Sequence, residues 1–414
     1  MVGWRDCKLG DLLQIKHGFA FLGEHFGSAG THIVLTPGNF LEEGGFKEKS
    51  DKAKWYSGPI PSDYVLKEGD LIVAMTEQAE GLLGSSAIIP RSGIYLHNQR
   101  LGLVQIRDRK QADQHFIYYL FNSKSVRQQI RGSASGAKIR HTAPSRIADV
   151  KISVPPLAVQ RRMATILSAY DDLIENNTRR IQILEQMAQA LYREWFVNFR
   201  FPGHAKVKRV ASALGPVPQG WQPGTLGDFA GEQRRAINPD EVEPDTPYIG
   251  LEHMPRKSIA LGEWGCAKEV QSTKLLFKKG DILFGKIRPY FHKVGVAAVD
   301  GVCSTDAIVI APKNPDHFAL VLACVSSEAF VSHATQTSQG TKMSRANWDV
   351  LTKYPLPLPP VLLLSQFSAS LNDAVALIQN LIFKNRNLRR TRDLLLPKLM
   401  SGALDVSKLD IETA

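Results

Sequence analysis

One loop of this sequence mixes basic and aromatic side chains in the order Lys-Ile-Arg-Pro-Tyr-Phe-His-Lys, over residues 286–293. An arginine in such a loop can form a bidentate pair with guanine in the major groove of DNA, while lysines bind phosphate oxygens. The loop therefore predicts a DNA contact in which Arg288 reads a base and the lysines hold the backbone. Its candidate residues are Lys286, Arg288, Tyr290, His292 and Lys293.

The corresponding loop in the first half of the chain has different chemistry. It reads Met75-Thr76-Glu77-Gln78. There the amide of Gln78 could read adenine and the carboxylate of Glu77 could read cytosine. Different side chains at one position are what two domains reading different bases would show, although unrelated drift of two loops would produce the same difference.

Two further segments combine guanidinium, amide and imidazole groups. Gly-Ala-Lys at residues 136–138 recurs as Gly-Thr-Lys at 340–342, and a repeated lysine favours phosphate binding over base reading. Asn-Gln-Arg at residues 98–100 precedes a predicted strand, where the same side chains would equally serve to brace a turn. The candidates in these segments are Asn98, Gln99, Arg100, Lys138, Arg140, His141, Arg146, Lys342 and Arg345.

The sequence lacks the motifs of common nucleic-acid enzymes. It contains no GxxxxGK[ST] loop and no HExxH. The pairs Pro155-Pro156 and Pro359-Pro360 lack the polar and aromatic neighbours of a DNA amino-methyltransferase loop, and the four cysteines never form CxxC. We therefore expect no catalytic residue, metal site or cofactor in this chain. A methyltransferase or nuclease with a divergent site is the enzymatic alternative.

The polar loops lie inside a sequence that repeats. The Trp-x(4)-Leu-Gly-Asp opening at Trp4 recurs at Trp221, an offset of 221 − 4 = 217, and Gly136 recurs as Gly340, an offset of 340 − 136 = 204. A period near 200 residues is too long for a solenoid, so it predicts a duplicated domain pair with a pseudo-two-fold repeat. Branched runs between turns, followed by helical stretches at 115–130 and 317–333, predict an α+β domain with irregular sheets in each half.

A heptad seam follows each predicted domain. Residues 157–201 contain no proline, so a helix of roughly 40 residues and about 60 Å is expected. Adding 204 gives the same seam in the second half. A stripe this long needs a partner, and we expect an antiparallel coiled coil, the alternative being a helix packed on its own domain. Asn177, Asn385 and Arg392 interrupt the seam and are expected to fix its register. The seam residues are Leu167, Ile174, Ile181, Leu184, Leu191, Leu371, Ile378, Leu381, Leu388 and Leu395.

Composition narrows the class of partner. The 414 residues carry a net charge of +11 and an isoelectric point near 9.4, which favours a nucleic-acid partner over a membrane, with a merely basic soluble protein as the alternative. No signal core or membrane span is evident, so a cytoplasmic protein is expected. The predicted divisions are 1–154 and 221–358 for the domains, 155–200 and 359–414 for the helices and tail, and 201–220 for a linker.

Together these features resemble the specificity subunit of type I restriction–modification systems. The resemblance rests on the two Trp-x(4)-Leu-Gly-Asp openings, on Gly-Asp-Ile-Leu-Phe-Gly-Lys-Ile-Arg-Pro from Gly280, and on Asn-Gln-Arg at 98–100. Pro-Pro-Leu at 155–157 before a long helix and the closing Leu-Leu-Leu-Pro-Lys-Leu-Met-Ser-Gly, which ends at Gly402, complete it. It implies two target recognition domains, each reading one half of an asymmetric bipartite DNA site, and helices that set the spacer.

The resemblance also implies partners. Two methyltransferase subunits would dock on the helices and domain flanks and carry S-adenosylmethionine, and restriction subunits, where present, would carry ATP and Mg. The start of the second helix, residues 361–366, is more apolar than the usual Pro-Leu-x-Glu-Gln form, and Val159 stands where Glu is common. A coiled-coil scaffold or transcriptional regulator that binds DNA without these partners is the remaining alternative.

Overall fold

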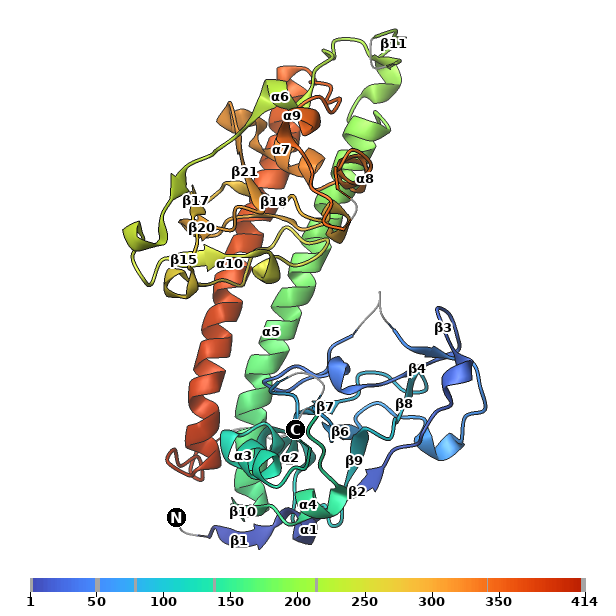
Figure 1. The fold of residues 1–414 in the computed structure, drawn as a ribbon, viewed down its shortest axis with the longest axis vertical. Coiled ribbons are helices and arrows are strands. Elements are labelled where there is room, and N and C mark those ends of the chain that lie inside the picture. Colours follow the sequence, from blue (N-terminus) through green and yellow to red (C-terminus); the bar gives the residue numbers. More distant parts are fainter. Residues whose placement is uncertain are drawn as a thin grey trace. The chain divides into compact units, whose positions relative to one another are not determined.

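The structure is a computed structural model in which the chain divides into two compact units (Figure 1). Unit 1 comprises Met1–Asp172 and Arg389–Ala414, and unit 2 comprises Leu173–Leu388. Gln78 and Lys138, two of the predicted contacts, lie outside the described residues. The described residues are 3–48, 53–77, 80–136, 139–212, 215–340 and 342–410.

Unit 1 contains two four-stranded sheets, ordered β2-β9-β6-β7 and β3-β5-β4-β8. The first is antiparallel throughout, whereas β4 and β8 of the second run parallel. Two more strands, β1 and β10, pair with each other. The strands are β1 Arg5–Lys8, β2 Leu13–His17, β3 Phe26–Gly27, β4 His32–Val34, β5 Trp55–Tyr56, β6 Leu71–Ala74, β7 Ser86–Ile88, β8 Tyr95–Leu96, β9 Leu101–Ile106 and β10 Lys151–Val154. The short helices are α1 Leu9–Leu12, α2 Gln114–Phe121, α3 Lys124–Gly132 and α4 Pro144–Ala148.

Unit 2 repeats this plan with sheets ordered β13-β21-β18-β19 and β14-β17-β20-β15-β16. Residues 201–220, predicted to be a linker, contain a further strand pair, β11 and β12. The strands are β11 Arg209–Val210, β12 Val217–Pro218, β13 Ala230–Glu232, β14 Ala236–Ile237, β15 Pro247–Ile249, β16 Gly265–Cys266, β17 Lys274–Phe277, β18 Ile282–Gly285, β19 Val294–Val296, β20 Gly301–Cys303 and β21 Ala307–Pro312. The short helices are α6 Leu226–Phe229, α7 Phe318–Val325, α8 Glu328–Gln336 and α9 Trp348–Leu351.

The two sheets that carry the predicted reading loops have the same strand order. β6 lies between β9 and β7 in unit 1, as β18 lies between β21 and β19 in unit 2. Leu71 of β6 pairs with Val104 as Ile282 of β18 pairs with Ile310. The register therefore matches residue for residue, which confirms the internal repeat.

The helical stretch expected after each sheet is broken into two helices, contrary to the prediction of one. In unit 2, α8 turns away from the preceding helical segment by 68°. The Ser326 hydroxyl donates to the carbonyl of Leu322, and the Ser327 hydroxyl accepts from the N–H of Phe330. These side chains compete with the helical backbone and cap the next helix, so the chain turns.

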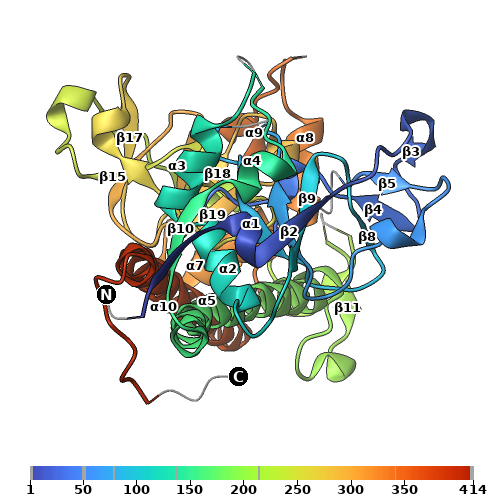
Figure 2. The same ribbon diagram turned by 90° about the horizontal axis from the view of Figure 1, so that it is seen from below.

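Two long helices follow the proline pairs directly, as predicted. Helix α5 spans Leu157–Tyr192, 36 residues, and α10 spans Val361–Met400, 40 residues. In unit 1, Asp171 contacts Arg392, and in unit 2, Trp195, just beyond α5, packs on Phe367. Partners later on α5 thus lie earlier on α10, so the pair is antiparallel, and both views show the helices side by side (Figures 1 and 2).

The predicted seam lies inside each unit. Leu167 belongs to the buried core of unit 1, with Leu395 packed against it. In unit 2 the seam residues Ile181, Leu371, Ile378 and Leu381 are buried in one cluster. The remaining predicted seam residues are half-buried. The stripe is therefore covered within the protein.

Among the described residues, α10 is the one unbroken helix that is long and apolar enough to cross a membrane. Its mean hydropathy is 1.5 over an 18-residue window. The expectation that no stretch approaches a membrane span is wrong for this window. Three of its apolar residues, Leu364, Phe367 and Leu371, lie buried in the core of unit 2. These three side chains pack within the protein, and 33% of the window is buried.

Candidate nucleic-acid interface

The predicted reading loop of unit 1 is tied to a hairpin by backbone contacts. Thr76 forms a β-bridge with His141, which in turn pairs with Ser135 across the hairpin. The N–H of Glu77 donates to the carbonyl of Arg140 at 2.9 Å. The residues that follow strand β6 and the paired residues Ser135, Arg140 and His141 therefore form one surface.

Unit 2 has the same backbone arrangement. Ile287 bridges Arg345, which pairs with Gln339 across the second hairpin. The N–H of Arg288 donates to the carbonyl of Ser344 at 2.8 Å. Each of these contacts has its counterpart in unit 1, so positions in the two halves can be matched by geometry rather than by loop length.

The matched positions carry unlike side chains on one backbone frame. Where unit 1 has an apolar or an acidic side chain, unit 2 has a basic one. Where unit 1 has a hydroxyl, unit 2 has an amide. This is the pattern expected when one scaffold presents different groups to different ligand sequences. The matched pairs are Met75 with Lys286, Glu77 with Arg288, Arg140 with Ser344, His141 with Arg345, and Ser135 with Gln339.

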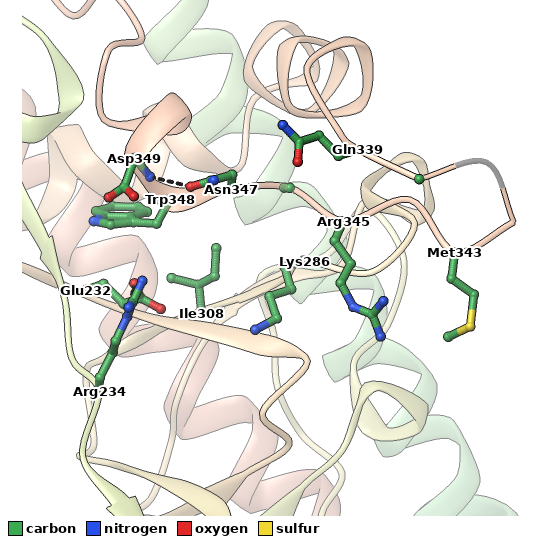
Figure 3. Close-up of a pocket in the computed structure, with 12 residues that line it drawn as sticks. Glu232, Arg234, Lys286, Ile308, Gln339, Met343, Arg345, Asn347, Trp348 and Asp349 are labelled. Carbon is green, nitrogen blue, oxygen red and sulfur yellow. Dashed lines mark hydrogen bonds and ion pairs between the residues drawn. The ribbon is translucent and has the colours of Figure 1, made fainter.

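Unit 2 contains an open pocket of about 560 Å³ at this surface (Figure 3). It brings together two predicted contacts, Lys286 and Arg345, with polar residues that the sequence patterns did not single out. Charges of both signs and two amides surround it, as suits the mixed donors and acceptors of a base edge. Its lining residues are Glu232, Arg234, Lys286, Ile308, Gln339, Gly340, Met343, Arg345, Ala346, Asn347, Trp348 and Asp349.

Tyr290 lies in a single helical turn, Pro289–Phe291, after β18, and Arg288 immediately precedes this turn. Arg288 adopts a left-handed backbone conformation with φ of 48°, and its guanidinium donates to the carbonyl of Lys342 at 3.4 Å. The Tyr290 ring is 54% exposed. Lys342 itself is exposed on the second hairpin. These three side chains remain candidates for DNA contact.

His292 is buried behind this loop, and Lys293 is half-buried next to it. His292 is 6% exposed, its Nε2 bonds the carbonyl of Ser326 at 2.9 Å, and burial lowers its pKa. The Lys293 ammonium donates to the carbonyl of Leu251, and burial lowers its pKa as well. The expectation that His292 contacts DNA is therefore corrected, whereas the contact of the half-buried Lys293 stays a prediction. Both side chains support the loop through these hydrogen bonds. The sequence pattern did not reveal this role, because a basic residue next to aromatic residues is equally suited to packing.

The segment 98–100 of unit 1 forms a turn that is closed by its own asparagine. The Asn98 side chain accepts from the N–H of Arg100 at 3.0 Å, which is the bracing role weighed above. A Cβ on Gly18 would lie 2.0 Å from the Asn98 carbonyl oxygen, so only glycine fits against this turn. Gln99 is exposed and Arg100 is half-buried.

The other unit 1 candidates support the hairpin. Arg146 donates to the Ser133 carbonyl at 3.1 Å and to the Ser135 hydroxyl at 3.0 Å. The His141 Nδ1 lies 3.1 Å from the Thr76 hydroxyl. Arg140 and His141 are both exposed, so they lie where a ligand can reach them.

The repeated aspartates after glycine close turns. Asp70 and Asp281 each accept a hydrogen bond of 2.8 Å from the N–H three residues earlier. The glycines before them, Gly69 and Gly280, have φ of 83° and 92°, which favours glycine. Among the residues that the structure describes, no group of three or more His, Cys, Asp or Glu side chains is placed to hold a metal ion.

Sequence reasoning missed the pocket residues outside the two loops. Glu232 ends strand β13, which carries no basic or aromatic run, and Arg234 lies just beyond it. Gln339, Asn347 and Asp349 flank the hairpin. The signal that could have found Arg234 is strand register. When β13 is aligned with β2, Arg234 occupies the position equivalent to His17 of unit 1.

Comparison with known proteins identifies the family. The family model for the type I restriction modification DNA specificity domain matches residues 1–186 and 218–362, more than three quarters of the chain. The chain is 25% identical over 310 residues to the type I restriction enzyme MjaIX specificity subunit of Methanocaldococcus jannaschii, covering 71% of this chain and 70% of the relative. It is 25% identical over 269 residues to the EcoDI specificity subunit of Escherichia coli, covering 59% of each. The S subunit of the type I restriction–modification system from M. genitalium has the same fold, with a TM-score of 0.60, 15% identity and 96% of both chains covered. Because the specificity-domain match extends over both halves of the repeat, the chain belongs to the type I restriction–modification DNA specificity family.

Proposed function

We propose that this chain is the DNA-reading subunit of a type I restriction–modification complex and that each unit reads one half of a bipartite, asymmetric site. The observation that carries the proposal is the shared backbone frame with unlike side chains at matched positions, such as Glu77 with Arg288 and His141 with Arg345. One frame positions DNA in the same way twice, and the differing side chains select different bases.

The long helices suit the role of a spacer. Helix α5, with 36 residues, is about 54 Å long at 1.5 Å per residue. Half-sites contacted from one face of DNA lie roughly 34–36 Å apart. The helix is longer than this separation, as a spacer requires.

Catalysis is assigned to partner subunits. Two methyltransferase subunits would dock on the helices and carry S-adenosylmethionine, and restriction subunits, where present, would carry ATP and Mg in the cytoplasm. Large apolar side chains on the long helices support docking: Ile183 and Met187 of α5 are 48% and 62% exposed, and Val361 and Leu362 of α10 are 84% and 71% exposed. Neighbouring exposed apolar residues mark protein interaction sites.

The test is the methylation pattern of cells that carry this chain together with its methyltransferase subunits. Long-read methylome sequencing should find a bipartite adenine-methylation motif that is lost when the chain is deleted. Replacing residues 3–154 with those of another family member should change one half of the motif and leave the other half unchanged. Methylation by the isolated chain would favour the enzymatic alternative, and DNA binding without any copurifying methyltransferase would favour a scaffold or regulator.

A further inference from the structure

An arginine on the pocket rim of unit 2 is held in place by a neighbouring carboxylate. Arg234 follows β13 after one residue, and its Nε donates to Oε2 of Glu232 at 2.7 Å. The Arg234 side chain is 70% exposed, whereas that of Glu232 is 10% exposed. The hydrogen bond to Glu232 raises the pKa of Arg234. A solvent-exposed guanidinium is thus tethered by a carboxylate that is itself largely covered (Figure 3).

The tether leaves the outer edge of the guanidinium for a ligand. The ion pair uses Nε, whereas Nη1 and Nη2 form the edge that can donate two parallel hydrogen bonds. A bidentate donor pair of this shape fits O6 and N7 of guanine. Because Glu232 already limits the side-chain conformations, less conformational entropy is lost when a base is bound.

The same position in unit 1 has different chemistry. Glu232 pairs with Ile310 on the neighbouring strand, as Ile15 pairs with Val104 in unit 1. Arg234 is therefore matched by His17, and its carboxylate tether by the apolar Ile15. The other matched pairs show the same kind of difference: the backbone contacts are alike in the two units, and the side chains differ.

We infer that Arg234, held by Glu232, is a specificity-determining residue of the second recognition domain and reads a guanine in that domain's half-site. The inference rests on the proposed function and adds to it the residue and the base. Lys286 lines the same pocket and supplies positive charge for the DNA backbone. Asn347 and Gln339 add amide groups at its edge.

The experiment uses the full chain in complex with its methyltransferase subunits. The wild-type motif is read from the methylome, and each base of the second half-site is then varied in duplex oligonucleotides. Arg234→Ala should lower the preference for guanine at one position by roughly ten- to a hundredfold. Arg234→Lys keeps the charge and should retain overall DNA affinity while losing that preference. Glu232→Ala should give a smaller loss of the same preference.

The neighbouring Arg235 provides the matched control. It is also an exposed arginine but does not line the pocket, so Arg235→Ala should leave the motif unchanged. Arg234 is mostly exposed, so its replacement should leave the fold intact, which circular dichroism and copurification of the complex check. A wild-type motif without guanine in the second half-site, or an unchanged guanine preference in Arg234→Ala, overturns the inference but leaves the proposed function standing. The absence of any bipartite motif in the wild type overturns the proposed function itself.

Discussion

The side-chain amide of Asn177 on α5 donates to that of Asn385 on α10 at 2.9 Å, inside the otherwise apolar seam of unit 2. The two residues are 8% and 4% exposed. The Asn385 amide donates in turn to the Thr178 hydroxyl at 3.2 Å. A buried polar pair of this kind satisfies its hydrogen bonds in one register of the helices only.

Replacing one member of this pair should cost more than replacing both. Asn177→Leu leaves the buried side-chain oxygen of Asn385 without its donor, so the free energy of unfolding should fall by about 1–3 kcal/mol. The double variant with Asn385→Leu removes both polar groups and should lie close to the wild type. Urea unfolding followed by tryptophan fluorescence measures the difference. Equal losses in the single and double variants would contradict the register role.

Asp171 of α5 links α2 and α10 within unit 1, and its replacement should also lower the free energy of unfolding. Its carboxylate accepts from Arg392 at 2.6 Å and from the hydroxyl of Tyr119 at 2.6 Å. The Arg392 side chain is 17% exposed, so Asp171→Asn leaves a largely buried guanidinium with less countercharge. Arg392 keeps a second carboxylate partner, Asp393, at 2.9 Å, so we expect a loss of about 2 kcal/mol in unfolding free energy. The control is Asp149→Asn, because the Asp149–Lys8 pair is exposed and should contribute less than about 1 kcal/mol.

His97 should make unit 1 sensitive to mild acid. The residue is 0% exposed, and burial lowers its pKa from 6.5 to about 4. Below pH 6.5 the histidine is protonated in the unfolded chain but stays neutral in the folded state. The contribution of His97 to the free energy of unfolding is therefore fully present above pH 6.5 and is lost as the pH falls towards 4. The loss is on the order of 3 kcal/mol.

Urea midpoints of the wild type and of His97→Gln, measured between pH 4 and pH 7, test this expectation. The Gln side chain can still donate to the Leu101 carbonyl that the histidine ring contacts at 2.9 Å. The variant should therefore show a flatter dependence over this range. A variant that loses stability as steeply as the wild type would assign the acid sensitivity to other groups.

Lys342 and Arg345 should separate phosphate binding from base reading. Lys342→Ala should weaken binding to cognate and scrambled DNA by the same factor and reduce the slope of log K against log salt by about one. Arg345→Ala should weaken binding mainly to cognate DNA. Fluorescence anisotropy of the assembled complex over a salt series measures both effects. A Lys342→Ala variant that affects cognate DNA alone would instead make Lys342 a base-reading residue.

The long-range plan of the fold could be predicted because it depends on regular spacing. The seam from Leu167 to Leu191 and its copy 204 residues later fix the long helices, and the proline pairs fix where they begin. The breaks between α7 and α8 could not be predicted from apolar periodicity. They depend on single serine hydroxyls that bond nearby backbone, such as Ser326 to Leu322.

The candidate interface was only partly predictable for a related reason. Composition located the loop that contains Arg288, but it could not separate outward side chains from the His292 ring, which turns inward to Ser326. Arg234 was missed because its partner Glu232 and its counterpart His17 are recognised through strand pairing. Sequence proximity finds loops, whereas the roles of individual side chains depend on tertiary contacts.

The chain order of the two units implies an order of folding during synthesis. Unit 2 is one continuous segment, Leu173–Leu388, whereas unit 1 is completed by residues from Arg389 onward. Leu399 and Val406 are 0% and 1% exposed in the core of unit 1. Most of unit 1 is translated first, but its core can be completed only after the last residues are made. The core of unit 2 can form earlier. A ribosome that stalls near residue 390 would release a chain with a finished unit 2 and a unit 1 whose apolar core is still open to chaperones and proteases.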